Sequence, residues 1–105
     1  MEPLNPVLHE GKRLGLLAVL RIGPETFSQL KHDSQLTDGN LEAHLKRLED
    51  AGYIARKKRM NPLLRRGKET VYAITEKGKA AFENYLQAME RKIKEARKLS
   101  SKPSP

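Results

Sequence analysis

The sequence contains no cysteine and no tryptophan, and aromatic residues make up only 5% of its 105 positions. The absence of cysteine excludes disulfide frameworks, thiolate zinc sites and cysteine nucleophiles. Long apolar runs are absent as well, because the longest, Leu14 to Leu20, is far too short to cross a bilayer. The segment Met1 to Pro6 has neither the basic nor the apolar region of a signal peptide. We therefore expect a small soluble protein of the cytoplasm without a membrane segment.

Motifs for catalysis and for metal binding are also missing. The sequence has no glycine-rich phosphate loop, no paired catalytic carboxylates and no nucleophile motif. Its three histidines, His9, His32 and His44, are not spaced with carboxylates in a way that suggests a metal site. The sequence thus predicts neither an enzyme, nor a cofactor, nor a bound metal.

Positive charge is what the chain has in excess. Its 21 Lys plus Arg against 13 Asp plus Glu give a net charge of +8, with a pI near 9.9, which indicates a polyanionic partner. The excess lies in residues 53–70, with seven basic residues and one acidic, and in residues 91–102, with six basic and one acidic. The second block fits a solvated tail equally well. Strand-like sequence on both sides of the first block would fix it in space.

The length and the hydrophobic content of 37% suit one small domain. We place this domain at residues 1–99. Residues 100–105 hold two prolines and no apolar residue, so we expect them to form a disordered tail.

Two helices are predicted in the first third of the chain. The first covers Val7 to Leu20, with Pro6 in its first turn, and Gly15 is expected to allow close packing against another helix. A second, shorter helix begins after Thr26, which forms a Thr-x-x-Gln capping box with Gln29.

A third helix is predicted from a cap at Thr37 or Asp38 to about Ala51, where Gly52 ends it. The i, i+4, i+7 spacing of its apolar residues gives it one core-facing side. These residues are Leu41, Leu45 and Leu48.

A hairpin and a long helix complete the predicted fold. The strands are Tyr53 to Arg59 and the β-branched and aromatic run Thr70 to Ile74, and the loop between them is Met60 to Glu69. A long helix follows from Thr75 and is amphipathic to about Ile93. The expected fold is mainly α with a two-stranded β-wing, in the order α-α-α-β-β-α with a long C-terminal helix. This is a winged helix-turn-helix.

Several stretches carry a family resemblance that is specific in combination. The main ones are residues 5–9 (Asn-Pro-Val-Leu-His), 48–54 (Leu-Glu-Asp-Ala-Gly-Tyr-Ile) and 70–78 (Thr-Val-Tyr-Ala-Ile-Thr-Glu-Lys-Gly). Over about residues 5–88 the chain resembles the MarR-like winged-helix transcriptional regulators, especially the short single-domain ones. The resemblance implies a sequence-specific DNA-binding regulator, with repression as the expected effect.

The resemblance also implies how DNA is bound. The third helix, residues 37–51, would enter the major groove, and the basic wing, residues 56–69, would contact the backbone or the minor groove. Residue chemistry agrees, because Asn, Arg and Ala suit adenine, guanine and the thymine methyl group. The candidate recognition residues are Thr37, Asn40, Ala43, Lys46 and Arg47, and the candidate wing residues are Lys58, Arg59, Arg65, Arg66 and Lys68.

Some features depart from the simplest DNA-binding pattern. Many MarR-like wings carry an Asp-x-Arg signature, and the loop here lacks the Asp, which leaves the geometry of its arginines open. We expect Leu63 and Leu64 of this loop to pack back on the domain, the alternative being insertion at a partner surface. Acidic residues also lie on or near the third helix: Asp38, Glu42, Glu49 and Asp50.

The first and last helices carry more apolar residues than the packing of one domain needs, so part of their apolar surface is left uncovered. Because relatives commonly dimerise through these helices, we expect a homodimer that binds a palindromic operator in double-stranded DNA. The third helix of one protomer would lie about 34 Å from that of its partner. The expected interface residues are Leu4, Val7, Leu8, Phe82, Tyr85, Leu86, Met89 and Ile93. The sequence identifies no small-molecule effector.

Two other functions stay open at this point. One is an architectural protein that binds DNA without sequence preference, and the other is a winged-helix adaptor for protein or RNA. An operator preference of at least about 10³ over bulk DNA would distinguish a regulator from both.

Overall fold

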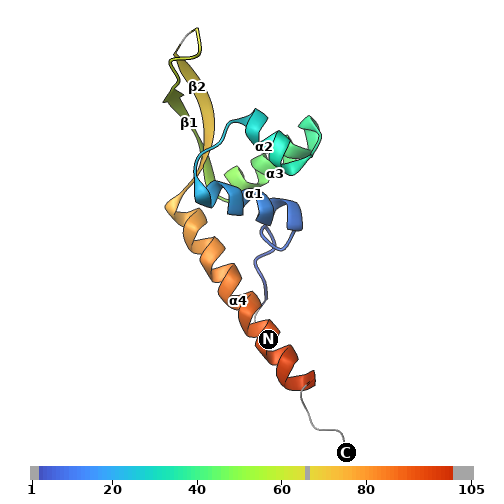
Figure 1. Cartoon of the computed structure of the whole chain (residues 1–105). Coiled ribbons are helices and arrows are strands. Elements are labelled where there is room, and N and C mark those ends of the chain that lie inside the picture. The colour runs from blue at the N-terminus through green and yellow to red at the C-terminus, as the bar shows by residue number, and fades with distance from the viewer. Residues whose placement is uncertain (1–2, 66, 101–105) are drawn as a thin grey trace, which may run out of the picture.

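The computed structural model describes residues 3–65 and 67–100, which form four helices and a two-stranded sheet (Figure 1). The elements are α1 (Gly11–Ile22), α2 (Phe27–Ser34), α3 (Asp38–Asp50), β1 (Ile54–Met60), β2 (Lys68–Ile74) and α4 (Glu76–Ser100). This order confirms the predicted winged helix. Ser100, the first residue of the predicted tail, is the last residue of α4, and residues 101–105 lie outside the described residues.

The molecule is long and narrow, with principal extents of 71 × 26 × 21 Å. In Figure 1 the helices α1, α2 and α3 form the body, the hairpin projects from one end, and α4 runs from the body toward the opposite end. The hairpin tip and the end of α4 therefore present separate surfaces.

The first helix begins at Gly11 and not at Val7 as predicted. The cause is Glu10, whose carboxylate accepts two N–H groups of the first turn at 3.0 and 3.1 Å and so caps the helix. The segment before it folds on Asn5, whose side-chain oxygen accepts the N–H of Val7 at 2.9 Å. Pro6 thus lies in a turn that precedes the helix.

The caps of α2 and α3 follow the sequence prediction. Thr26 accepts the N–H of Gln29 at 3.1 Å, and the Gln29 side chain accepts the N–H of Thr26 at 2.8 Å, which completes the capping box. Of the two predicted caps of α3, Thr37 is the one observed, and Asp38 is the first helical residue. The Thr37 hydroxyl accepts the N–H of Asn40 at 3.3 Å.

The hairpin is longer than predicted. Met60 pairs with Lys68, so the loop covers residues 61–67 and the prediction of a loop over residues 60–69 is wrong. Past this pair, the N–H of Asn61 still donates to the carbonyl of Gly67 at 2.7 Å. Gly67 has a φ of +69°, a left-handed conformation that glycine adopts without strain, and this reverses the chain.

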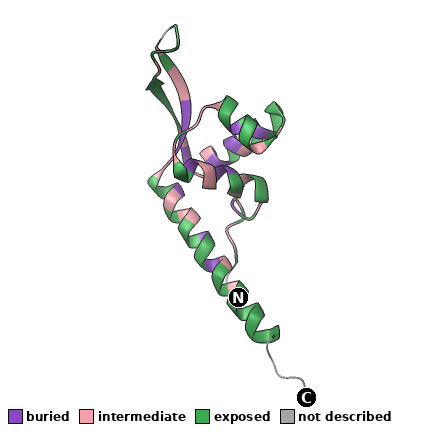
Figure 2. Cartoon of the chain, in the orientation of Figure 1, coloured by how far each residue is buried: buried purple, intermediate pink, exposed green. Residues whose placement is uncertain are grey.

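One hydrophobic core joins the helices to the base of the hairpin (Figure 2). Ile54 and Tyr72 of the hairpin are buried there together with the three predicted leucines of α3, none of which is more than 1% exposed. Gly15 faces open space, so the expectation that it allows close packing is wrong. The core residues are Leu8, Leu16, Leu17, Leu20, Leu30, Leu41, Leu45, Leu48, Ile54, Tyr72 and Tyr85.

A tight junction connects α3, the hairpin and α4. Gly52 ends α3 with a φ of +80° and accepts a hydrogen bond from the Thr75 hydroxyl at 2.6 Å. The N–H of Thr75 donates to the carbonyl of Tyr53 at 2.9 Å, and its hydroxyl accepts the N–H of Gly78 at 2.9 Å. A Cβ at Gly78 would collide with the Tyr53 carbonyl and lie 2.9 Å from the Ile74 side chain. Only glycine fits at this point without displacing the strand.

Candidate nucleic-acid interface

The face of α3 opposite the core is open to solvent. Thr37 uses one lone pair of its hydroxyl as the helix cap, so its O–H stays available to donate outward. Lys46 lies 3.5 Å from Asp50, whereas Arg47 takes part in none of the ion pairs found within residues 3–65 and 67–100. All five predicted residues are exposed: Thr37, Asn40, Ala43, Lys46 and Arg47. Gly39, Glu42 and Asp50 are exposed as well.

Most of the acidic residues near α3 have a basic partner. Asp38 lies 2.7 Å from Lys31 of α2, and Glu49 lies 3.2 Å from Arg56 of β1. Glu42 is exposed, and its charge also acts on the Arg56 guanidinium. Asp38 and Glu49 therefore each offset only the charge of the basic side chain beside them. The excess of positive charge near α3 comes from the wing.

The wing presents a row of exposed cations. Arg59 donates to Glu69 at 2.6 Å, and this hydrogen bond lowers the pKa of the Glu69 carboxyl. Of the predicted residues Lys58, Arg59, Arg65 and Lys68 are exposed, and Arg66 lies outside the described residues. Lys57, which the prediction left out, is exposed as well. Along the described part of the wing, Lys57, Arg65 and Lys68 join no ion pair and are available to a polyanion.

The wing tip is apolar and does not pack on the domain. Leu63 is 92% exposed and Leu64 is 41% exposed, so the expectation that both pack back is wrong. Met60, at the end of β1, is 68% exposed. The physical reason is distance, because the hairpin is buried only at its base and its tip lies beyond the core (Figure 2).

Arg56 links α3 to the wing, a role that sequence reasoning missed. Its guanidinium contacts the Glu49 carboxylate at 3.2 Å, near the end of α3, and lies over the Tyr72 ring at 5.7 Å from the centroid. Strand alternation contained the signal: Arg56 is two residues from the buried Ile54 and pairs with Tyr72 across the hairpin. Arg56 thus connects the end of α3 to the wing.

Comparison with known protein families assigns the chain to a family. The family described as a winged helix DNA-binding domain matches residues 13–93, which is most of the chain. The chain belongs to this family. A related sequence is the uncharacterized protein MJ0432 of Methanocaldococcus jannaschii, which is 45% identical over 60 residues. That match spans 57% of this chain and 62% of the relative.

Solved structures confirm the resemblance to MarR-like regulators. A transcriptional regulator homologue from Pyrococcus horikoshii OT3 has a TM-score of 0.73 and 27% identity, over 86% of this chain and 87% of that one. A mutant MarR of E. coli in complex with operator DNA has a TM-score of 0.59 and 26% identity, over 73% of this chain and 53% of that one. The fold is therefore that of winged-helix DNA-binding transcriptional regulators, a class of proteins that are not enzymes.

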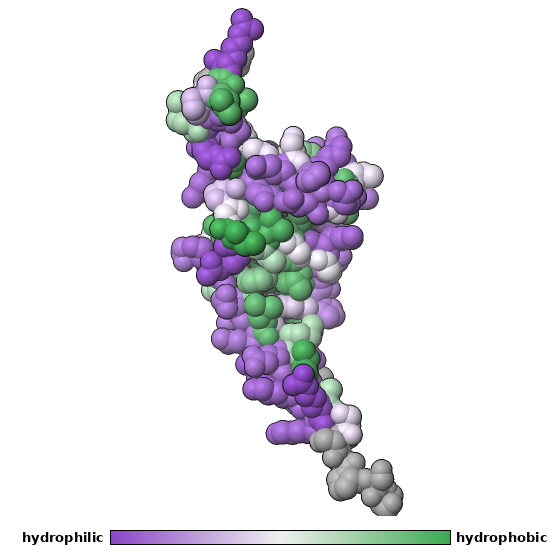
Figure 3. Space-filling model, in the orientation of Figure 1, coloured by the Kyte–Doolittle hydropathy of each residue, from purple (hydrophilic) through white to green (hydrophobic). Residues whose placement is uncertain are grey.

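The predicted dimer residues of this winged helix domain fall into three groups: buried, exposed and half-buried. Leu8 and Tyr85 are 0% and 5% exposed, and the Tyr85 hydroxyl lies 3.0 Å from Nδ1 of His9, so both residues serve the core of the protomer. Leu86 and Ile93 are 43% and 46% exposed. The half-buried members are Leu4, Val7, Phe82 and Met89. Figure 3 shows hydrophobic side chains in a band that runs from the body down along α4.

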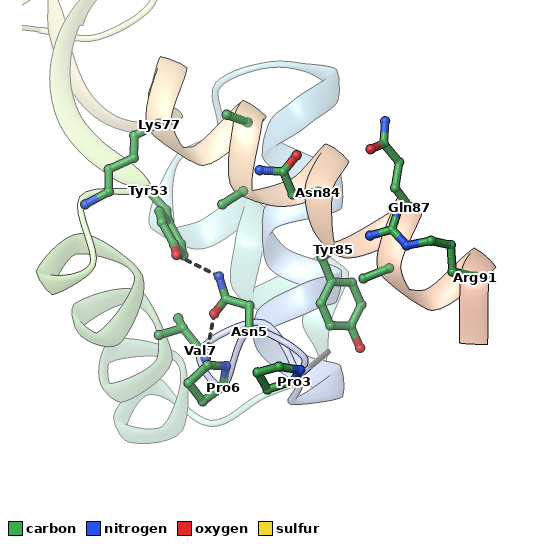
Figure 4. Close-up of a pocket in the computed structure, with 13 residues that line it drawn as sticks. Pro3, Asn5, Pro6, Val7, Tyr53, Lys77, Asn84, Tyr85, Gln87 and Arg91 are labelled. Carbon is green, nitrogen blue, oxygen red and sulfur yellow. Dashed lines mark hydrogen bonds between the residues drawn. The ribbon is translucent and has the colours of Figure 1, made fainter. Parts of the chain in front are cut away.

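A groove of about 780 Å³ lies between the N-terminal segment and α4 (Figure 4). Asn5 spans its floor and donates to the Tyr53 hydroxyl at 2.8 Å, and the Lys77 ammonium lies 5.9 Å from the centroid of the Tyr53 ring. Asn84 and Arg91 of α4 line the other side. The groove is open and mixed in polarity, which suits a protein surface better than an enclosed small molecule.

Neither a metal site nor a membrane span is found where the structure can be described. Residues 3–65 and 67–100 hold no cluster of three His, Asp or Glu side chains arranged for a metal ion. No helix in the same ranges is both long and apolar enough to span a bilayer.

Glu25 ties the start of α2 to the wing at an electrostatic cost. Its main chain exchanges two hydrogen bonds with Tyr72 of β2, at 2.8 and 3.1 Å. Its Oε2 is buried and has no hydrogen-bond partner among the described residues. Burial raises the pKa of the Glu25 carboxyl above its ordinary value of 4.5, and the neighbouring Asp33 raises the pKa further.

We predict that Glu25→Gln raises the thermal midpoint at pH 7. Because the folded-state pKa is raised, the native state holds this proton more tightly than the unfolded state does. The favourable contribution of Glu25 is therefore complete below pH 4.5 and is lost as the pH rises through the raised pKa. Thermal unfolding followed by circular dichroism at pH 7 and at pH 4 measures this, and the gain from the substitution should shrink at pH 4.

Glu42→Gln is the matched control, because Glu42 is an exposed carboxylate on α3. It should leave the midpoint nearly unchanged at both pH values. A lower midpoint for Glu25→Gln at pH 7 would show that the carboxylate stabilises the fold, contrary to this account.

Proposed function

We propose that this protein is a sequence-specific transcriptional regulator that acts as a homodimer on a palindromic operator, with repression as the expected effect. In this proposal α3 enters the major groove and the wing contacts the backbone or the adjacent minor groove. The observation that carries it is the exposed Asn40, Ala43 and Arg47 on a helix whose opposite side is fixed in the core, beside a cationic hairpin. The similarity to a MarR that was solved with operator DNA supports the same placement.

The chemistry of the α3 face supports base recognition. An Asn side chain can both donate to and accept from an adenine edge, Arg can donate twice to guanine, and Ala can contact a thymine methyl group. Thr37, at the N-terminus of α3, has a free O–H that can donate to a phosphate near the positive end of the helix dipole.

The wing supplies contacts of another kind. Three wing cations have no carboxylate partner within the described residues: Lys57, Arg65 and Lys68. Each carries its charge at the end of a long, flexible side chain. Such cations bind phosphates with little dependence on sequence and release counterions, so their contribution weakens as salt rises. Base contacts from α3 and phosphate contacts from the wing are separable by experiment.

The dimer is proposed to form along α4. Phe82, Leu86, Met89 and Ile93 follow one another at spacings of four, three and four residues, which places them on one stripe of the helix. Part of this stripe is exposed, and α4 extends beyond the body toward the end opposite the wing (Figure 1). A two-fold axis there would leave both α3 faces free for half-sites about one turn of DNA apart.

We predict that Asn40→Ala and Arg47→Ala each weaken binding to the operator by roughly 10- to 100-fold, the equivalent of losing one bidentate base contact. Binding to scrambled DNA should change little. Lys57→Ala and Arg65→Ala should weaken both DNAs alike and reduce the salt dependence. Fluorescence anisotropy with DNA from upstream of the protein's own gene, against scrambled DNA of equal length at two salt concentrations, measures this.

Lys94→Ala is the matched charge control, because Lys94 lies on α4 far from the wing and should leave both affinities unchanged. Equal binding of both DNAs that collapses at higher salt would favour the architectural or adaptor function. Absence of binding at either salt would contradict the proposal.

We predict that Leu86→Asp combined with Ile93→Asp converts the dimer to a monomer. The new carboxylates would face one another across an apolar contact, while each site is exposed enough for the protomer to stay folded. Light scattering during size-exclusion chromatography should show a mass near 11.9 kDa in place of twice that value. Leu63→Asp, at the opposite end, is the control and should remain dimeric; a monomeric wild type would rule out the dimer.

A further inference from the structure

The wing tip presents an exposed apolar side chain on a hydrogen-bonded turn. Asn61 organises it: its side-chain oxygen accepts the N–H of Leu63 at 3.0 Å, and its carbonyl accepts the N–H of Leu64 at 3.0 Å. The Asn61 amide also donates to Glu69 at 3.1 Å, and the N–H of Gly67 donates back to Leu64 at 2.9 Å. Leu63 is therefore presented to solvent, 92% exposed, on a turn that these hydrogen bonds hold.

The surroundings of the tip are cationic. Arg65 lies two residues from Leu63, and Lys57, Lys58 and Lys68 follow along the two strands, all of them exposed. This combination fits a polyanion that also offers an apolar slot. A second copy of the tip is disfavoured by the like charges, because cations in close approach repel.

The position of the tip favours DNA over other polyanions. The hairpin is fixed to α3 through the core and the Arg56–Glu49 contact, so the tip accompanies α3 to whatever α3 binds. A seven-residue strand spans about 20 Å, which is enough to reach from the major groove to the next minor groove. The minor groove, about 6 Å wide, admits single side chains.

We propose that Leu63 is a minor-groove wedge, which inserts at a base step beside the α3 half-site, partly unstacks it and bends the DNA. The inference rests on the proposed function and goes beyond it, since it adds a contact that senses how easily the DNA deforms. Leucine and proline at such positions unstack and kink base steps in other minor-groove proteins. The proposal assigns a role to Leu63, which is the most exposed of the apolar wing residues that the structure describes and takes no part in the core.

The experiment places 2-aminopurine at successive positions of the bound promoter fragment. The full-length protein should raise the fluorescence at one step in each half-site, because unstacking relieves the quenching of this base. Leu63→Ala should abolish the increase and reduce the bend measured by energy transfer between the DNA ends. Its affinity should fall by only about 3- to 10-fold, because it loses the burial of one side chain but is spared the cost of unstacking.

Two variants separate the wedge from a general weakening of binding. Leu63→Met should keep the fluorescence increase, since methionine is also an effective apolar wedge. Leu99→Ala, which alters an exposed leucine at the far end of α4, should change neither fluorescence nor bend. The salt dependence of Leu63→Ala should match that of the wild type, because no charge is altered.

The outcomes distinguish the wedge from the proposed function. Specific binding without an increase at any position would overturn the wedge and leave the regulator intact, whereas no binding to DNA would overturn both. Vesicles of phosphatidylcholine with phosphatidylglycerol test the other polyanion that could accept an apolar tip. Vesicle binding that needs Leu63, together with DNA binding that does not, would assign the tip to a lipid surface and overturn the wedge.

Discussion

The hydrogen-bonded junction between Gly52–Tyr53 and Thr75–Gly78 is the constraint on which the rest of the structure depends. Thr75 donates to two successive carbonyls of the chain that leaves α3, and Gly78 approaches one of them so closely that no Cβ fits. The helix α3 ends at this junction, both strands of the hairpin have their bases there, and α4 starts there. The junction therefore sets the directions of α3, the hairpin and α4 relative to one another. The helix α3, the wing and α4 can therefore move only together or by breaking these hydrogen bonds.

Burial and charge have different parts in holding the candidate interface. Burial of Ile54 and Tyr72 contributes most, since a fully buried side chain of this size is worth about 1.5–3 kcal/mol. The Arg56–Glu49 pair is exposed, so salt screens it and it adds little stability. Its effect is directional, because it ties the Arg56 guanidinium to the end of α3. Lys57 lies on the opposite face of the strand and is exposed. The hydrophobic core holds the candidate interface in place, and the exposed basic side chains of the wing give it its positive charge.

Local signals in the sequence predicted much of this and missed what depends on distant contacts. The leucine spacing of α3, the Thr26 capping box and Gly52 each act within a few residues, and each was confirmed. The predicted start of α1 was wrong because Glu is an uncommon N-cap residue and because a proline such as Pro6 is typical of a first helical turn. The position of Leu63 depends on how far the hairpin extends beyond the core. Tyr85 and Leu86 lie next to each other on α4, and periodicity alone could not separate the core face from the free face.

The most direct test is amide chemical-shift mapping of the full-length, isotope-labelled protein during titration with DNA from upstream of its gene. The account predicts that shifts concentrate on Asn40 to Arg47 of α3 and on the wing from Lys57 to Lys68, with α4 beyond Ile93 unaffected by DNA. A second basic region, the C-terminal part of α4 around Lys94, is the natural competitor. Shifts confined to that region, with α3 and the wing unchanged, would contradict the account.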